Sequence, residues 1–216
     1  MLTWGGVKWR IVNILRGLFA VLRHLPGVIK LGRKKFFQLY SPYGFLDRSK
    51  SKLRPYYKAA LFLETYARKF DIDLLLNAHY ITHWIDVDMS GRVNNDDLLG
   101  IAEGLIRKYA SASLVITSRI HAGLPCLGLH TPVIFVANKE VTSEAGSFNT
   151  PGRLEGLLEF FRILNLDHGK FTCDDAVLSS IDIFTLDTHF ENKNNWISYA
   201  QELDKKASEF MKKGAG

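Results

Sequence analysis

The amino-acid sequence predicts an α/β fold: a single Rossmann-like, three-layer domain with a mostly parallel sheet, preceded by a basic helical arm. Its centre is a strand–turn–helix–turn–strand pattern over residues 109–136. The distribution of charge indicates where the arm ends and the domain begins, because residues 1–58 hold thirteen Lys or Arg and one acidic residue. Residues 59–216 hold fifteen Lys or Arg against twenty-one Asp or Glu. We therefore expect an arm and linker over residues 1–54 and one domain over residues 55–216.

The central pattern is composed of two apolar, β-branched segments, residues 114–117 and 133–136, which are typical of strands in a parallel sheet. Residues 122–129, between them, are small and apolar, which suits a helix packed closely on that sheet. Pro125 lacks an N–H and is best tolerated in the first turn of a helix, so the helix is expected to begin near residues 121–124.

The turn before that helix contains Ser118, Arg119 and His121. Ligands of open α/β sheets bind at the carboxyl ends of parallel strands, and helix N-termini there favour anions. The spacing therefore predicts an anion site with a titratable group beside it.

The remaining elements follow from hydrophobic periodicity, with strands and helices alternating from residue 71 onward. We expect a first strand over residues 71–76, a strand near Phe171, and loops over 137–150 and around 182–187. Helices are expected over residues 56–70, 97–109, 151–161 and 194–213. The apolar stripe of the helix over 97–109 is expected to face inward and consists of Leu98, Ile101, Ala102, Leu105 and Ile106.

The residue types present limit which kinds of functional site the chain could contain. The two cysteines form neither a disulfide framework nor metal spacing, and Cys126 is expected to be a packed thiol. Asp86 and Asp88 resemble a metal-holding acidic pair but lack supporting residues, so we expect a solvated loop and no metal. His130 is expected to be a structural turn residue. Because the net positive charge is confined to the arm and the domain is net negative, we expect no nucleic-acid partner.

The arm has helical periodicity over residues 7–25, and Arg16 and Arg23 interrupt any membrane span. Two interpretations stay open: a helix lying on an anionic membrane surface through residues 7–35, or a basic helix packed on a protein domain. An Arg-rich presequence is a lesser third. The expected location is cytoplasmic, with or without peripheral membrane contact.

Residues 115–134 read VITSRIHAGLPCLGLHTPVI and resemble the polysaccharide pyruvyl transferase family. The family pattern is a strand, T-S-R-[LI]-H, a small-residue helix containing L-P-C, and a strand opened by P-V-I. Weaker similarities are Thr-His at His83, a helix ending at Tyr109, and R-x-x-G-L at Arg153, so that the resemblance covers roughly residues 71–161.

The resemblance implies a glycosyltransferase-B-like fold and transfer of the enolpyruvyl unit of phosphoenolpyruvate to two sugar hydroxyls, forming a ketal. It maps the phosphoenolpyruvate-binding Arg onto Arg119 and the catalytic His onto His121. Further substrate-binding residues are expected at Thr117, Ser118, Arg153 and His83. Phosphoenolpyruvate is then a donor substrate, no cofactor is implied, and the acceptor is a surface glycan or its lipid-linked precursor.

The family's N-terminal Rossmann-like half has no visible counterpart before Pro55. A partner subunit or a second copy is expected to supply that side of the cleft, unless the chain is a fragment or has lost catalysis. Two alternatives to the pyruvyl transferase therefore stay open. One is half of a sugar-nucleotide-dependent glycosyltransferase with Arg119 on the diphosphate, and the other is a non-catalytic subunit.

Overall fold

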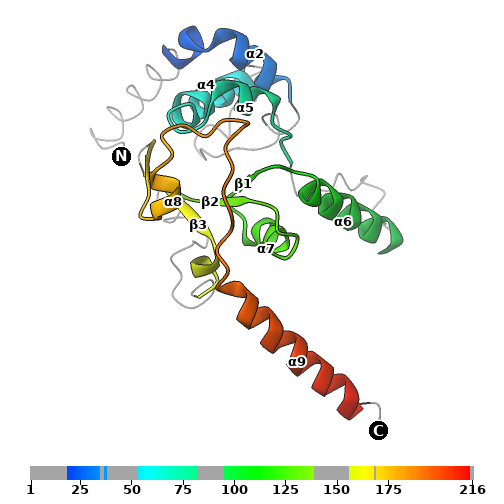
Figure 1. Ribbon diagram of the computed structural model, residues 1–216. Helices are drawn as coiled ribbons and strands as arrows, with labels where there is room; N and C mark the ends of the chain where they lie inside the picture. Colours follow the sequence, from blue (N-terminus) through cyan, green and yellow to red (C-terminus); the bar gives the residue numbers. More distant parts are fainter. Residues whose placement is uncertain are drawn as a thin grey trace, which may run out of the picture. The chain divides into compact units, whose positions relative to one another are not determined.

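The computed structural model describes residues 19–34, 37, 53–81, 95–138, 156–167 and 169–214 (Figure 1). Within these residues the chain is a mixed α/β protein with a four-stranded, mostly parallel sheet, as predicted. Contacts divide it into one unit of residues 1–91 and 181–188 and another of residues 92–180 and 189–216. The three-layer arrangement and the basic arm stay predictions.

The second unit holds the sheet, whose strand order is β1-β2-β3-β4. The strands are β1 (Val115–Thr117), β2 (Val133–Asn138), β3 (Arg162–Asp167) and β4 (Lys170–Thr172). β1, β2 and β3 are parallel, and β4 runs antiparallel to β3. The two central strands and the strand near Phe171 were predicted. β3 was not, although Leu164 and Leu166 alternate with more exposed positions along it.

Helix α7 (Ile120–Gly128) packs closely on this sheet through Gly123. A Cβ atom at Gly123 would lie 2.7 Å from Cε1 of Phe161, whose buried ring lies 5.3 Å from that of Phe135 on β2. The helix begins at Ile120, so the prediction that Pro125 lies in the first turn was wrong. Pro125 lies inside the helix, because packing on the sheet offsets the loss of one backbone hydrogen bond.

The first unit is helical in its described part and consists of α2 (Leu25–Gly32), α4 (Arg54–Tyr66), α5 (Ile72–Asn77) and the segment around Phe184. The helix predicted over 56–70 is therefore present as α4. The rings of Phe70 and Phe184 stack with centroids 5.2 Å apart. The amide of Asp71 donates to the carbonyl of Phe184 at 2.7 Å, and the Phe184 amide donates to that of Lys69 at 2.8 Å.

Residues 71–76 form helix α5, not the predicted first strand. Asp71 caps it, because its carboxylate accepts the amide of Asp73 at 2.8 Å, and such a cap contributes about 1 kcal/mol. Leu74 and Leu75 are buried in consecutive positions, which places them on one side of a helix turn, whereas a strand would send them to opposite faces.

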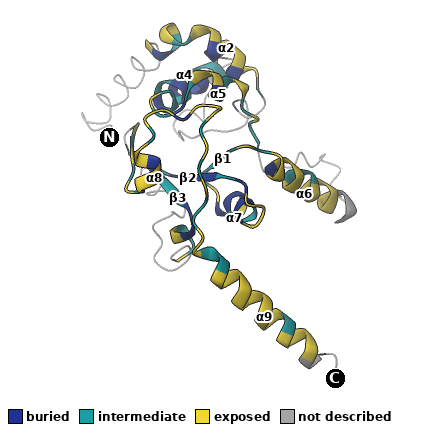
Figure 2. Cartoon of the chain, in the orientation of Figure 1, coloured by how far each residue is buried: buried dark blue, intermediate teal, exposed yellow. Residues whose placement is uncertain are grey.

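Helix α6 (Asn95–Ala110) contains the helix predicted over residues 97–109, but the prediction that its apolar stripe faces inward was wrong. Leu98, Ile101, Ala102 and Ile106 are exposed and Leu105 is half-buried, whereas Tyr109 near the C-terminus is buried (Figure 2). The periodicity identified the helix correctly, because it depends only on spacing. It could not show what covers the stripe.

The helix predicted over 151–161 was wrong in its described part. Gly156 has φ +86°, which ends any helix, and only η3 (Leu158–Phe160) follows before β3 begins. The predicted C-terminal helix is present as α9 (Trp196–Gly214), and residues 182–187 are largely irregular, as expected.

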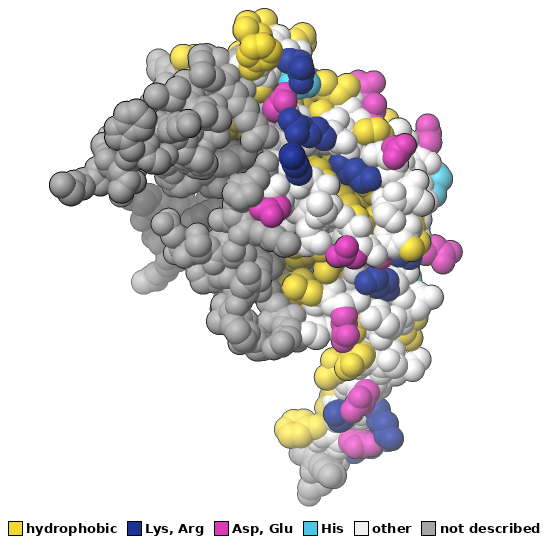
Figure 3. Space-filling model, turned by 90° about the vertical axis from the view of Figure 1, so that its left-hand side faces the viewer, with side chains coloured by type: hydrophobic (Ala, Val, Ile, Leu, Met, Phe, Trp, Pro, Cys, Tyr) yellow, Lys and Arg dark blue, Asp and Glu magenta, His cyan; other side chains and the backbone are white. Residues whose placement is uncertain are grey.

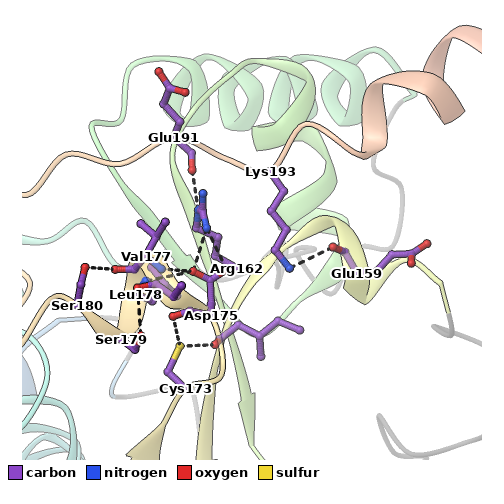
Figure 4. A network of polar contacts seen from close by, with 12 residues as sticks. Glu159, Arg162, Cys173, Asp175, Val177, Leu178, Ser179, Ser180, Glu191 and Lys193 are labelled. Atoms are coloured by element: carbon purple, nitrogen blue, oxygen red, sulfur yellow. Dashed lines mark hydrogen bonds and ion pairs between the residues drawn. The ribbon is translucent and has the colours of Figure 1, made fainter.

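Strand β3 is joined to α8 (Ala176–Ser179) by a network of polar contacts (Figure 4). Arg162 Nη1 donates to both carboxylate oxygens of Asp175, at 2.9 and 3.0 Å. The same carboxylate accepts the amides of Val177 and Leu178 and so caps the helix. Arg162 Nε also donates to the carbonyl of Glu191, at 2.6 Å.

Candidate active site

The β1–α7 turn forms the candidate site. Thr117 ends β1, and its hydroxyl oxygen accepts the amide of Arg119 at 3.0 Å. Arg119 is the N-cap residue of α7, with extended backbone angles, and its carbonyl accepts the amides of Ala122 and Gly123. The hydrogen bond between the Thr117 hydroxyl and the Arg119 amide therefore stabilises the turn, and the close packing of α7 on Phe161 fixes the position of the helix that follows.

Arg119 and His121 are both exposed, whereas Ile120 between them is buried. The buried Ile120 directs its two neighbours toward solvent on the same short turn. Within the described part of the chain, neither the guanidinium nor the imidazole has a hydrogen bond or an ion pair. Both groups are therefore accessible to a ligand.

The first turn of α7 is electropositive. No side chain caps it, and it contains no acidic residue. The helix dipole and the unpaired amides of a helix N-terminus favour an anion, and the guanidinium of Arg119 adds a full positive charge. This arrangement can bind a carboxylate or a phosphate with a proton donor or acceptor beside it.

The family model for polysaccharide pyruvyl transferase matches residues 22–140, which is more than half of the chain. The chain belongs to the polysaccharide pyruvyl transferase family. No curated protein and no solved structure matches it. The family match includes β1, α7 and β2. It begins inside the segment predicted as an arm and ends before Arg153.

In this pyruvyl transferase family member, four of the six predicted site residues lie on one turn: Thr117, Ser118, Arg119 and His121. The other two, His83 and Arg153, lie outside the described residues, as do Asp86, Asp88 and most of the loop predicted over 137–150. Among the residues that the structure describes, no group of three or more His, Cys, Asp or Glu side chains could hold a metal ion.

Tyr109 lies near the site and was not among the predicted site residues. Burial raises the pKa of its phenol, and the positive charge of Arg119 opposes that shift. The hydroxyl of Thr131 donates to the Tyr109 carbonyl at 3.0 Å, which ties the end of α6 to the segment before β2. The only sequence signal was a tyrosine closing the helix before β1.

Two nearby residues have structural roles, as predicted. Cys126 is fully buried and donates to the carbonyl of Ala122 at 3.1 Å, and burial raises its pKa to about 11, so it is a protonated thiol at neutral pH. His130 has φ 56°, and its amide donates to Leu127 while that of Thr131 donates to Cys126. These bonds form a Schellman motif that ends α7.

Proposed function

We propose that the protein transfers the pyruvyl group of phosphoenolpyruvate to two hydroxyls of a sugar. Two C–O bonds form at C2 of the enolpyruvyl unit, and the bond from C2 to the phosphate oxygen breaks. The hydroxyls lose two protons, of which one converts the terminal methylene to a methyl group and the other leaves with the phosphate. The observation that carries this proposal is the exposed Arg119–His121 pair on the matched family segment.

Arg119 binds the carboxylate or the phosphate of the donor. Its planar guanidinium can grip either group through two parallel hydrogen bonds, and the first turn of α7 adds positive potential. Thr117 and Ser118 contribute contacts from the same turn, and Arg153 and His83 complete the donor site. No cofactor takes part.

His121 moves the protons. An imidazole can take a proton from an attacking hydroxyl and deliver one to the methylene carbon or to the leaving phosphate. Three residues separate His121 from Thr117 at the end of β1, and on this short turn it reaches the bound donor while Arg119 holds the anion.

The acceptor is a surface glycan or its lipid-linked precursor, and a second copy or a partner subunit supplies the opposing side of the cleft. The reaction takes place in the cytoplasm, where phosphoenolpyruvate is produced. Nucleic acid is not a partner. A sugar-nucleotide diphosphate is the competing donor, because it presents the same anion chemistry to Arg119.

The test of Arg119 is phosphate release from phosphoenolpyruvate with galactose- or mannose-type acceptors. We expect Arg119→Ala to raise the KM for phosphoenolpyruvate by about 10-fold to 200-fold, because a charge-assisted contact is lost. Arg107→Ala is the control, since Arg107 is also exposed, on α6, but pairs with Glu103 at 2.6 Å. It should leave the KM unchanged.

The test of His121 compares His121→Asn with His130→Asn. Loss of the proton-transfer group should lower kcat by about 10²-fold to 10⁴-fold. Asn tolerates the left-handed backbone of His130, so the second variant should retain full activity. Tighter binding of a nucleotide sugar than of phosphoenolpyruvate would favour the glycosyltransferase. Absence of phosphate release from folded protein with candidate partners would favour a non-catalytic subunit.

A further inference from the structure

The helical segment over residues 19–32 has two apolar faces. One is buried against α4, with Ala20, Val28 and Leu31 inaccessible to solvent. The approach of the two helices is close, because a Cβ atom at Gly32 would lie 2.4 Å from Cδ1 of Tyr56. This face is fully explained by packing within the first unit.

The other face is exposed and equally apolar. The exposed fractions are 72% for Phe19, 77% for Leu22, 47% for Leu25 and 41% for Ile29. These residues recur at helical spacing on the two sides of a turn at His24, and we call them the outer stripe. A helix with one packed face normally carries polar residues on the opposite side, and packing among the described residues of the first unit does not account for the outer stripe.

Within residues 19–34 the Lys, Arg, Asp and Glu side chains are all of one sign, positive. Residues 19–34 contain Arg23, Lys30, Arg33 and Lys34 and no acidic residue. Lys30 donates to Asn77, a neutral partner. Arg23, whose own side chain is largely exposed, lies 3.6 Å from Glu64, whose side chain is only 14% exposed and also contacts His24 and Arg68. Figure 3 shows hydrophobic side chains at the top of that view, with Lys or Arg, His and an Asp or Glu side chain directly below them.

We propose that the outer stripe docks on an anionic lipid membrane surface. Exposed Phe and Leu side chains enter the boundary between headgroups and acyl chains, and flanking Lys and Arg side chains contact the anionic headgroups. The contact is peripheral. Among the described residues, no helix has the length and apolar character needed to cross a bilayer. The proposal does not depend on the proposed reaction, because vesicle binding requires no turnover.

Helix α9 provides the contrast that gives the proposal its specificity. It also exposes large apolar residues, among them Leu203 and Phe210. However, Glu202, Asp204 and Glu209 alternate with its lysines, and Glu202 pairs with Lys206 at 2.6 Å. Acidic residues beside the apolar stripe oppose docking on anionic lipid. Of these two exposed apolar stripes, the outer stripe alone has only positive charges in its own segment.

The experiment is co-sedimentation of the full chain with phosphatidylglycerol–phosphatidylcholine vesicles and with phosphatidylcholine vesicles. We expect binding to the anionic vesicles that weakens as salt is raised. The double variant Phe19→Ser/Leu22→Ser should reduce this binding by about tenfold or more. The matched variant Leu203→Ser/Phe210→Ser should leave it unchanged. Circular dichroism verifies that both are folded.

Three results would overturn the proposal. The first is absence of sedimentation with anionic vesicles, and the second is equal loss of binding in both double variants. The third is a lower molecular mass in solution, measured by light scattering, for the Phe19→Ser/Leu22→Ser variant but not for the Leu203→Ser/Phe210→Ser variant. The outer stripe would then be a protein–protein interface.

Discussion

At the scale of single residues, the site depends on how closely α7 approaches the sheet. Gly123 permits that approach, and the buried ring of Phe161 occupies the space that a side chain at position 123 would need. Arg119 and His121 are displaced whenever the helix is displaced, because both belong to its first turn or cap.

Gly123→Ala tests this contact. The added methyl group would lie under 3 Å from an aromatic ring that is itself buried, so we expect a loss of about 1–3 kcal/mol in the free energy of unfolding. Urea denaturation measures it. Gly128→Ala in the same helix is the control, because no atom lies within 4 Å of its Cβ position, and the stability should stay level or rise by up to about 1 kcal/mol.

The residues of the candidate site could be predicted from the sequence because their positions are local. A β-branched strand followed by a small-residue helix puts Thr117, Ser118, Arg119 and His121 on one turn, whatever the rest of the fold does. The proximity of Tyr109 could not be predicted in this way. It depends on where the end of α6 packs, and only tertiary contacts decide that.

At the scale of elements, local sequence predicted those strands and helices whose pattern has one interpretation. β2 is a run of buried β-branched and aromatic residues, and α4 begins with a proline at its N-terminus. α5 was misassigned because a short run of Leu suits both helix and strand, and the Asp71 cap decided between them. The exposed stripe of α6 shows the same limit, since periodicity reveals a face and not its partner.

The contacts between Arg162 on β3 and Asp175 at the start of α8 give a prediction at the scale of elements. Asp175→Ala removes the ion pair with Arg162 and the cap of α8 together, so we expect a loss of about 2–4 kcal/mol in unfolding free energy. Asp175→Asn retains an oxygen that can accept the helix amides, and it should lose about half as much. Equal losses in the two variants, measured by urea denaturation, would show that the helix cap contributes little and that the ion pair with Arg162 accounts for the loss.

At the scale of the whole molecule, the two units are interleaved along the chain. Residues 181–188 belong with the first unit, although residues on both sides of them belong with the second. Phe184 is the anchor, because it is fully buried and exchanges backbone hydrogen bonds with Lys69 and Asp71.

Phe184→Ala should destabilise the first unit by about 3–5 kcal/mol, since a large, fully buried ring is removed. Amide hydrogen exchange locates the effect: protection should fall at Asp71 and along α5, while the amides of β2 keep theirs. Ile183→Ala is the control, because its exposed side chain lies next to Phe184 and its loss leaves the core filled. Equal loss of protection in β2 would mean that the units unfold together.

The segment over residues 181–188, which belongs to the first unit, also affects the order in which the protein can fold during its synthesis. Lys69 bonds to the carbonyl of Ile181, a partner 112 positions later in the chain. On the ribosome, the helices of the first unit therefore emerge long before the residues that complete their core. Phe70 lacks its stacking contact with Phe184 while the sheet-forming segments are translated. Chaperone demand should be greatest in that interval, and it should end when Phe184 leaves the exit tunnel.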